Sequence, residues 1–105
     1  MIYLASPYTG TPAEQDFRYS QAKAFTQLYL AKGHHIYSPI CYGHQFATAL
    51  GNNFKSWAAF SEHMLGLASE LWILQLPGWD TSVGVKQEIQ LYQFLYPEQI
   101  RFIPQ

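Results

Sequence analysis

Hydrophobic residues along the chain form short continuous runs that alternate with longer stretches of helical spacing. The continuous runs are Met1 to Ala5 and Leu71 to Leu74, and an apolar run without alternation is typical of a parallel strand covered on both faces. Shorter segments at His34 to Ser38 and Gln99 to Ile103 predict a second strand and a last strand. The pattern therefore predicts four strands with helical segments between them.

The first helical segment begins at residues 11–14, Thr-Pro-Ala-Glu. This sequence combines a capping box with proline at the first helical position, which marks a helix start. The helix is expected to stop at Gly33, because glycine readily adopts the conformation that ends a helix. The apolar residues expected along it are Phe17, Ala24, Leu28 and Ala31.

Two further helices are predicted in the second half of the chain. The first carries apolar residues at helical spacing, namely Trp57, Phe60, Met64 and Leu67. The second follows Pro77-Gly78, which ends the third strand, and is capped by Thr81 or Ser82. Its buried stripe is expected at Val85, Ile89, Tyr92 and Tyr96. Residues 39–51 predict a loop or short helix, which Asn52-Asn53 interrupts.

Helices that alternate with apolar strands predict a parallel sheet with right-handed crossovers. We therefore expect an α/β fold, a small three-layer doubly wound domain of flavodoxin or Rossmann type with four to five strands. At 105 residues, of which 49% are hydrophobic, the chain is expected to form one domain with a single core.

Composition narrows the classes of partner. Charged residues make up only 12% of the chain and no Lys/Arg run is present, so a nucleic-acid polymer is not an expected ligand, whereas free nucleotides are. The single Cys41 excludes an internal disulfide, and no leader or long apolar segment is visible, which predicts a cytoplasmic protein without a membrane partner.

Aromatic residues make up 17% of the chain, more than a core of this size is expected to hide. We therefore expect a homodimer or higher homo-oligomer. The expected contact surfaces are the Trp57 helix and the Glu88 helix, including Tyr92, Phe94 and Tyr96.

Loops after the strands of such a sheet line its ligand crevice. Here these loops are residues 6–10, 39–44 and 78–82, and they carry a mixture of aromatic, hydroxyl and titratable side chains. The set is Ser6, Tyr8, Thr9, Cys41, Tyr42, His44, Trp79, Asp80 and Ser82. Aromatic faces stack on flat rings, and hydroxyls or helix N-termini receive phosphate, so the set predicts a small polar ligand with a flat ring.

Glu88 borders the buried stripe of the last helix, three residues after Val85. Helical side chains lean toward the N-terminus, so its carboxylate is expected to point at the turn formed by residues 78–82. A carboxylate aimed into the crevice is a candidate catalytic group. The alternative is an ordinary surface glutamate.

Three stretches of this chain resemble the nucleoside 2-deoxyribosyltransferase-like superfamily, in particular a short branch with a Pro-Gly-Trp turn. They are residues 2–8, Ile-Tyr-Leu-Ala-Ser-Pro-Tyr; residues 33–40, Gly-His-His-Ile-Tyr-Ser-Pro-Ile; and residues 76–84, which lead to Glu88. The Gly-Trp-x-x-Ser-x-Gly-x-x-x-Glu element is the specific part of the resemblance, which covers nearly the whole chain.

The resemblance implies roles for individual residues. Glu88 matches the nucleophile that attacks the anomeric carbon and expels the base, and Tyr3 matches the tyrosine that orients it. Ser82 stands where related 2′-deoxynucleoside 5′-monophosphate N-hydrolases have a serine that faces the phosphate. Tyr8 matches an aromatic residue beside the base, and Arg18 matches a family arginine, although a structural arginine is an equal alternative. The ligand-binding set is completed by Ser6, His44, Trp79, Asp80 and Gly84.

One position departs from the family pattern. The aspartate that assists departure of the base is replaced here by Ser61, and the adjacent Glu62 is rotated by about 100° on a helix. A second acid of the branch is replaced by Ser69, next to Glu70. Either the register shifts by one residue through this helix, or the acid is lost. Asp80 and His44 are the other candidates for the proton donor.

The expected function is therefore transfer or hydrolysis of the N-glycosidic bond of a (deoxy)nucleoside or its 5′-monophosphate, without a cofactor. The alternative is a non-catalytic nucleotide-binding or sequestering protein on the same fold. Two other interpretations are weaker. Residues 6–11 only partly match a flavin phosphate loop, and Cys41-x-x-His44 with His34, His35 and His63 lacks the second ligand pair of a typical metal site, so no metal is expected.

Overall fold

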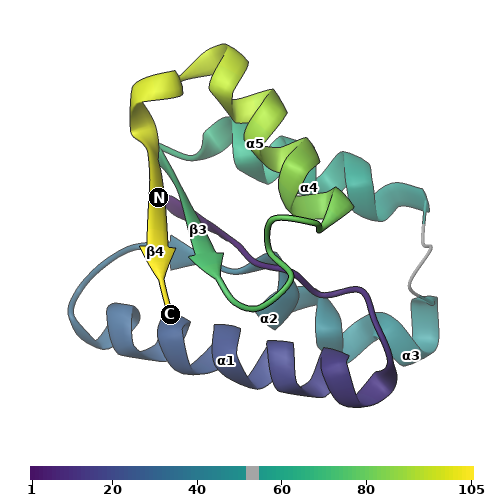
Figure 1. The fold of residues 1–105 in the computed structure, drawn as a ribbon. Coiled ribbons are helices and arrows are strands. Elements are labelled where there is room, and N and C mark those ends of the chain that lie inside the picture. Colours follow the sequence, from purple (N-terminus) through teal and green to yellow (C-terminus); the bar gives the residue numbers. More distant parts are fainter. Residues whose placement is uncertain (52–54) are drawn as a thin grey trace.

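A computed structural model of the protein describes residues 1–51 and 55–105 and contains a four-stranded parallel sheet flanked by helices (Figure 1). The strands are β1 (Ile2–Ala5), β2 (Ile36–Tyr37), β3 (Glu70–Gln75) and β4 (Ile100–Pro104), in the order β2-β1-β3-β4. All three neighbouring pairs are parallel. The α/β class and the small flavodoxin/Rossmann-like sheet predicted from the sequence are confirmed.

The helices connect the strands as the hydrophobic pattern predicts. The long helices are α1 (Pro12–Ala31), α4 (Lys55–Leu67) and α5 (Val83–Leu95). The segment after β2 forms the short helices α2 (Pro39–Gly43), η1 (His44–Phe46) and α3 (Ala47–Leu50), and η2 (Pro97–Gln99) precedes β4. The predicted interruption at Asn52-Asn53 lies outside the described residues. Within residues 1–51 and 55–105, no helix is both long and apolar enough to cross a membrane.

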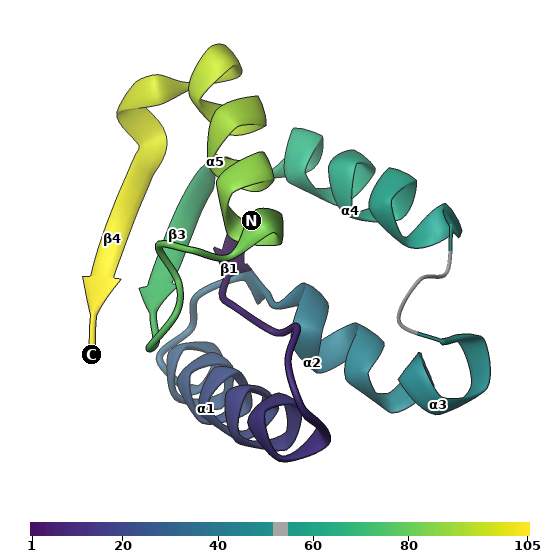
Figure 2. The same cartoon turned by 45° about the vertical axis from the view of Figure 1, so that its right-hand side comes forward.

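The two faces of the sheet are covered by different helices, which gives the three layers (Figure 2). On one face, Phe25 and Tyr29 of α1 pack against a core that includes Leu4, Trp72 and Leu74. On the other face, α4 and α5 contribute a core made of Tyr3, Ala5, Leu65, Ala68, Leu71, Ile73, Val85 and Tyr92. Burying each large apolar side chain contributes roughly 1.5–3 kcal/mol, so these two clusters supply most of the stability.

Both predicted helix starts have the expected caps. The Thr11 hydroxyl accepts a hydrogen bond from the Glu14 backbone N–H (3.2 Å), and Glu14 Oε1 accepts one from the Thr11 N–H (3.0 Å), which completes the capping box. Ser82, one of the two predicted caps of α5, accepts a hydrogen bond from the Val85 N–H (3.3 Å). These caps fix the residues at which α1 and α5 begin, after the loops that follow β1 and β3.

The faces of the helices differ in part from the prediction. Phe17 and Leu28 of α1 are about half exposed (52% and 51%), because Ala22, Phe25 and Tyr29 form the inner face instead. Tyr96 was expected in the buried stripe of α5, and this prediction is wrong. The helix ends at Leu95, and Tyr96 is 49% exposed where the chain turns into η2.

The inner face of α4 is also rotated from the predicted one. Leu67 is 62% exposed, whereas Leu65 and Ala68 are buried. Of the predicted face, Met64 packs against the core, whereas Phe60 and Leu67 are exposed and Leu65 is the helix residue that enters the core. Ser61 therefore lies on the inner side of α4, ahead of Leu65.

The strand order places a topological switch point between β1 and β3. The helix after β1 lies on one face of the sheet, and the helix after β3 lies on the other (Figure 2). The loops therefore separate at the carboxyl ends of these two strands, and ligands of open α/β sheets bind in the crevice that results.

Candidate active site

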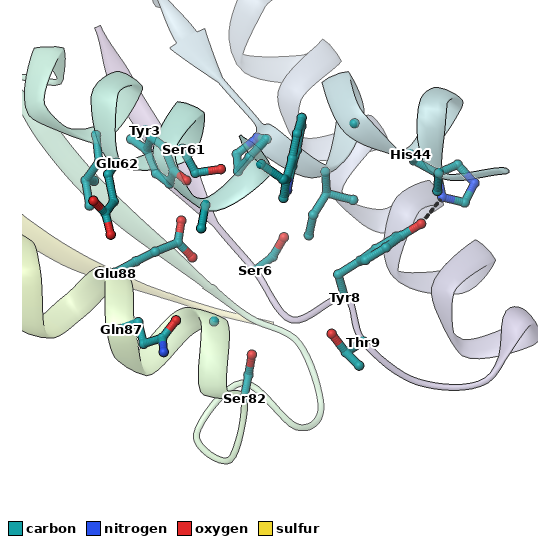
Figure 3. A pocket seen from close by; sticks show the side chains of 18 of the residues that line it. Tyr3, Ser6, Tyr8, Thr9, His44, Ser61, Glu62, Ser82, Gln87 and Glu88 are labelled. Atoms are coloured by element: carbon teal, nitrogen blue, oxygen red, sulfur yellow. Dashed lines mark hydrogen bonds between the residues drawn. The ribbon is translucent and has the colours of Figure 1, made fainter. Parts of the chain in front are cut away.

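A cavity of about 810 Å³ opens beside this switch point. Its walls come from the loop after β1, the α2–α3 segment, the inner side of α4 and the first half of α5 (Figure 3). This volume lies within the range of small-molecule sites.

Most of the residues predicted for the site share this cavity. The cavity-lining members of the predicted set are Tyr3, Ser6, Tyr8, His44, Ser82, Gly84 and Glu88. The other three, Arg18, Trp79 and Asp80, lie outside the cavity that the described residues form. The loops after β1, β2 and β3 therefore all reach this cavity, but Cys41, Tyr42, Trp79 and Asp80 of these loops do not line the part of it that the described residues form.

Glu88 projects into the cavity from the second turn of α5 (Figure 3). The helix is anchored by Val85 and Tyr92, which are 1% and 0% exposed, so the direction of the Glu88 side chain is set by core packing. Burial disfavours the charged carboxylate and raises the pKa of Glu88 to about 7, while the facing Tyr3 hydroxyl lowers it in part. Such a carboxyl changes its charge near neutral pH, which is a property of catalytic acids and nucleophiles.

Tyr3 and Ser6 bring hydroxyl groups to the same end of the cavity. Both side chains are buried, and neither hydroxyl oxygen has a hydrogen-bond partner of standard geometry within residues 1–51 and 55–105. Burial, followed by the charge of Glu88, raises the pKa of the Tyr3 hydroxyl far above its ordinary range, so Tyr3 stays protonated. The Tyr3 hydroxyl faces the Glu88 carboxyl and Ser61, so Ser6 is the buried cavity hydroxyl that is left for a ligand to complete.

Ser61 and Glu62 both line the cavity from α4. Figure 3 shows Ser61 beside Tyr3, and Glu62 on the same side of the cavity as Glu88. The rotation expected between adjacent helical residues does not remove Glu62 from the cavity, because the longer glutamate side chain reaches its edge. Two carboxylates therefore border the same space.

Ser82 and Thr9 line the lower side of the cavity in Figure 3. As the N-cap of α5, Ser82 accepts a hydrogen bond at its oxygen, which leaves its hydroxyl proton free to donate. The N-terminus of this 13-residue helix adds a partial positive charge at the same point. This side of the cavity is therefore suited to an anionic group.

The opposite end of the cavity is closed by a chain of paired groups. The Tyr8 hydroxyl lies 2.6 Å from His44 Nδ1, and His44 Nε2 lies 3.5 Å from the Asp16 carboxylate. Tyr19 stacks on the His44 imidazole at 4.2 Å between ring centroids. His44 thus has a partner at both ring nitrogens, and the Tyr8 hydroxyl points away from Glu88 (Figure 3).

Arg18 connects two of the cavity loops from behind. Its guanidinium donates to the Thr9 carbonyl (2.6 Å) and to the Pro77 carbonyl (3.3 Å). The Arg18 side chain is only 15% exposed, and it lies so close to Gly78 that a Cβ there would be 2.9 Å from Nη2. These contacts favour a structural role for Arg18 over a role in ligand binding.

The remaining polar candidates belong to other parts of the molecule. Trp79 contacts Phe102 of β4, and Asp80 is exposed in the turn before α5. Glu70 forms an ion pair with Arg101 (2.9 Å) at the start of β3, and Ser69 contacts the N-terminus. The second acid position therefore lies at the opposite end of β3 from the cavity.

Metal-ligating residues do not form a cluster in the part of the chain that the structure describes, where no three His, Cys, Asp or Glu side chains are close enough to hold an ion. Cys41 Sγ lies 3.9 Å from the Thr26 hydroxyl, and His44 is engaged by Tyr8 and Asp16.

Trp57 and Glu62 are among the cavity residues that the sequence-based prediction of the site missed. Trp57 was assigned to the apolar stripe of α4, and Glu62 was set aside because of its rotation. The cavity face of α4 follows from the sequence spacing, because Trp57, Ser61 and Leu65 are four residues apart. That signal was available, but the competing spacing through Phe60, Met64 and Leu67 carries more hydrophobic residues.

The chain belongs to the DUF1937 family, because the model of this family, described as a domain of unknown function, matches residues 1–98. No curated protein matches the chain.

Proposed function

We propose that this member of the DUF1937 family cleaves the N-glycosidic bond of a (deoxy)nucleoside or its 5′-monophosphate and passes the sugar to water or to another base. The observation that carries the proposal is the Glu88 carboxyl, with a pKa of about 7, facing an open cavity at the switch point of the sheet. The sequence resemblance to the nucleoside 2-deoxyribosyltransferase-like superfamily supports the same reaction class.

Glu88 acts as the nucleophile in this proposal. Its carboxylate oxygen forms a bond to the anomeric carbon, the carbon–nitrogen bond to the base breaks, and the electron pair leaves with the base. The Tyr3 hydroxyl, which faces Glu88 and has no partner of standard geometry among the described residues, donates to the carboxylate or to the sugar. Because the carboxylate form of Glu88 is required, the rising limb of the pH–rate profile is expected near its pKa of about 7.

Glu62 supplies the proton in this reaction. A retaining glycosyl transfer uses two carboxyl groups that flank the scissile bond, and Glu62 is the second carboxyl on the Glu88 side of the cavity (Figure 3). It donates its proton to the departing base and recovers one from the water or base that attacks the glycosyl ester. Glu62→Gln is therefore expected to slow base release by about 10²–10⁴-fold.

A 5′-monophosphate is the favoured form of the substrate. The support is the free hydroxyl proton of Ser82 and the N-terminus of α5, which together suit a phosphate. Ser82→Asp keeps a capping side chain but adds a negative charge, so it is expected to weaken binding of a nucleoside monophosphate and to leave binding of the nucleoside unchanged. Isothermal titration with both ligands measures this, and equal affinity of the unmodified protein for both contradicts the phosphate site.

The decisive experiment is a panel of deoxynucleosides and their 5′-monophosphates, with free base detected by chromatography. Release of base by the unmodified protein and none by Glu88→Gln supports the proposed reaction. The second candidate function is binding without turnover, which the serine at position 61 favours. Thermal stabilisation by a ligand from the panel without release of its base supports this second function.

Self-association accompanies the proposed function. The support is an exposed apolar surface on α5 and the segment after it, where Phe94 is 87% exposed and Leu91, Leu95 and Tyr96 are 39–49% exposed. Tyr92, which was expected both in the buried stripe of α5 and on this contact surface, is fully buried as the stripe predicts, and it donates to the Ala68 carbonyl (2.9 Å). Sedimentation at micromolar concentration tests the proposal, and a mass near 12.1 kDa identifies a monomer.

A further inference from the structure

One wall of the cavity, opposite the polar groups, is apolar and has no role in the reaction described above. It is formed by the α2–α3 segment and the start of α4, and it includes Ile40, Gly43, Phe46 and Trp57. An apolar wall beside a polar end is the arrangement of sites that bind a ligand with one flat ring and one hydrophilic part.

Trp57 is held in a fixed orientation by neighbours that do not line the cavity. The rings of Tyr42 and Phe60 lie nearly parallel to the indole, with interplanar angles of 11° and 25° and centroid distances of 6.2 and 5.9 Å. Both rings contact the indole without lining the cavity that the described residues form. The indole is therefore pre-ordered, which reduces the entropy cost of stacking a ligand on it.

Gly43 allows this position of the indole. A Cβ at residue 43 would lie 2.3 Å from the Trp57 ring, much closer than real contacts, so any side chain there must displace the indole. The position of the Trp57 indole therefore depends on the glycine at residue 43.

We infer that Trp57 is the platform on which the base of the substrate stacks, and that the base is a purine. The inference rests on the proposed function for the identity of the ligand. The two fused rings of indole match the area of a bicyclic base better than that of a single ring, and stacking strengthens with the area of contact. Trp57 is then a specificity-determining residue, while Glu88 and Glu62 perform the reaction.

The chain offers a direct readout, because its three tryptophans lie in different surroundings. Trp57 lines the cavity, Trp72 belongs to the core under α1, and Trp79 contacts Phe102. A free purine is therefore expected to quench tryptophan fluorescence, whereas deoxyribose 5-phosphate, which lacks a base, is not. Trp57→Leu removes the quenching and weakens purine binding by about tenfold or more, as measured by isothermal titration. Trp79→Leu, the matched control, keeps both.

Gly43→Ala provides a second test in case Trp57→Leu does not fold. It keeps the tryptophan but displaces its ring, so purine binding is expected to weaken while binding of deoxyribose 5-phosphate stays unchanged. Unchanged purine affinity in Trp57→Leu, a pyrimidine bound as tightly as a purine, or no binding of purine to the unmodified protein overturns the inference. Base release is measured separately. Purine binding through Trp57 without release contradicts only the proposed reaction, and release that does not depend on Trp57 contradicts only the stacking role.

Discussion

The polar groups at the two ends of the cavity differ in whether other side chains pair with them (Figure 3). At the Glu88 end, the carboxyl is desolvated and the Tyr3 and Ser6 hydroxyls have no partner of standard geometry among the described residues. At the His44 end, each polar group is paired, from the Tyr8 hydroxyl through the imidazole to the Asp16 carboxylate. Unpaired buried groups cost stability, and proteins retain them where a ligand or a reaction uses them.

This difference separates the residues proposed to react with a ligand from the residues that stabilise the structure around it. Arg18 belongs to the supporting group, because its guanidinium satisfies two loop carbonyls, those of Thr9 and Pro77. The Glu88 end therefore carries the proposed reactivity, and the His44 end maintains the shape of the cavity.

The largest effect is expected from Glu88→Gln on the rate of base release. Because the amide cannot form the glycosyl ester, the rate should fall by at least about 10³-fold. The rate is measured by chromatography with the best substrate of the panel. Glu98→Gln, an exposed glutamate in η2, is the matched control and should retain the full rate. A Glu88→Gln protein with more than a tenth of the original rate contradicts nucleophilic catalysis at this residue.

The same substitution should stabilise the fold at alkaline pH. The pKa of Glu88 is about 7 in the folded protein, and 4.5 is the value of an ordinary glutamate, as in the unfolded chain. The folded protein therefore holds this proton more tightly. The tighter binding of this proton adds to the free energy of unfolding. The added free energy is complete below pH 4.5 and is lost as the pH rises through 7, a difference of up to about 3 kcal/mol. Urea unfolding at pH 8 should therefore show Glu88→Gln to be more stable than the unmodified protein, with a smaller difference at pH 5. The same difference at both pH values contradicts the raised pKa.

The supporting role of Arg18 is tested by Gly78→Ala. Gly78 has a φ of +92°, which an L residue adopts at a cost, and its Cβ would approach Arg18 Nη2 to 2.9 Å. The free energy of unfolding should fall by about 1–2 kcal/mol as the Arg18 contacts loosen. Gly33→Ala is the matched control, since Gly33 also has a φ of +92° but a Cβ there meets no atom within 4 Å, so it should show only the cost of the backbone conformation. Equal effects of the two substitutions would show that Arg18 does not hold these loops.

Local sequence rules predicted the elements of this fold because they act over short distances. The capping box at Thr11 and the cap at Ser82 are completed within four residues, so both helix starts were correct. The place of Glu88 one turn inside a helix that Val85 anchors predicted that it enters the crevice, but its carboxyl faces Tyr3 rather than the turn of residues 78–82. Such features depend on the chain near them rather than on the packing of distant elements.

Helix orientation was less predictable, because it is decided by the opposing surface. The sequence offers two apolar faces on α1 and two on α4, and only contact with the sheet selects the faces that carry Phe25 and Leu65. The cavity roles of Trp57 and Glu62 depend on that selection, so they appeared only in the structure. The role of Arg18 was also not predictable. Its partner, the Pro77 carbonyl, is distant in sequence, and no residue near Arg18 distinguishes this contact from ligand binding.

The smallest effects are expected from removing one hydroxyl at each end of the cavity, and they should have opposite character. Tyr8→Phe loses the 2.6 Å contact with His44, so the free energy of unfolding should fall by about 0.5–1.5 kcal/mol, while base release changes by less than about fivefold. Tyr3→Phe removes the buried hydroxyl that faces the Glu88 carboxyl, so base release should fall by about tenfold or more, while the free energy of unfolding should change less than in Tyr8→Phe. Urea unfolding and chromatography on both proteins measure the two quantities. If Tyr3→Phe loses stability and keeps its rate while Tyr8→Phe does the reverse, the reactive end and the supporting end have been assigned the wrong way round.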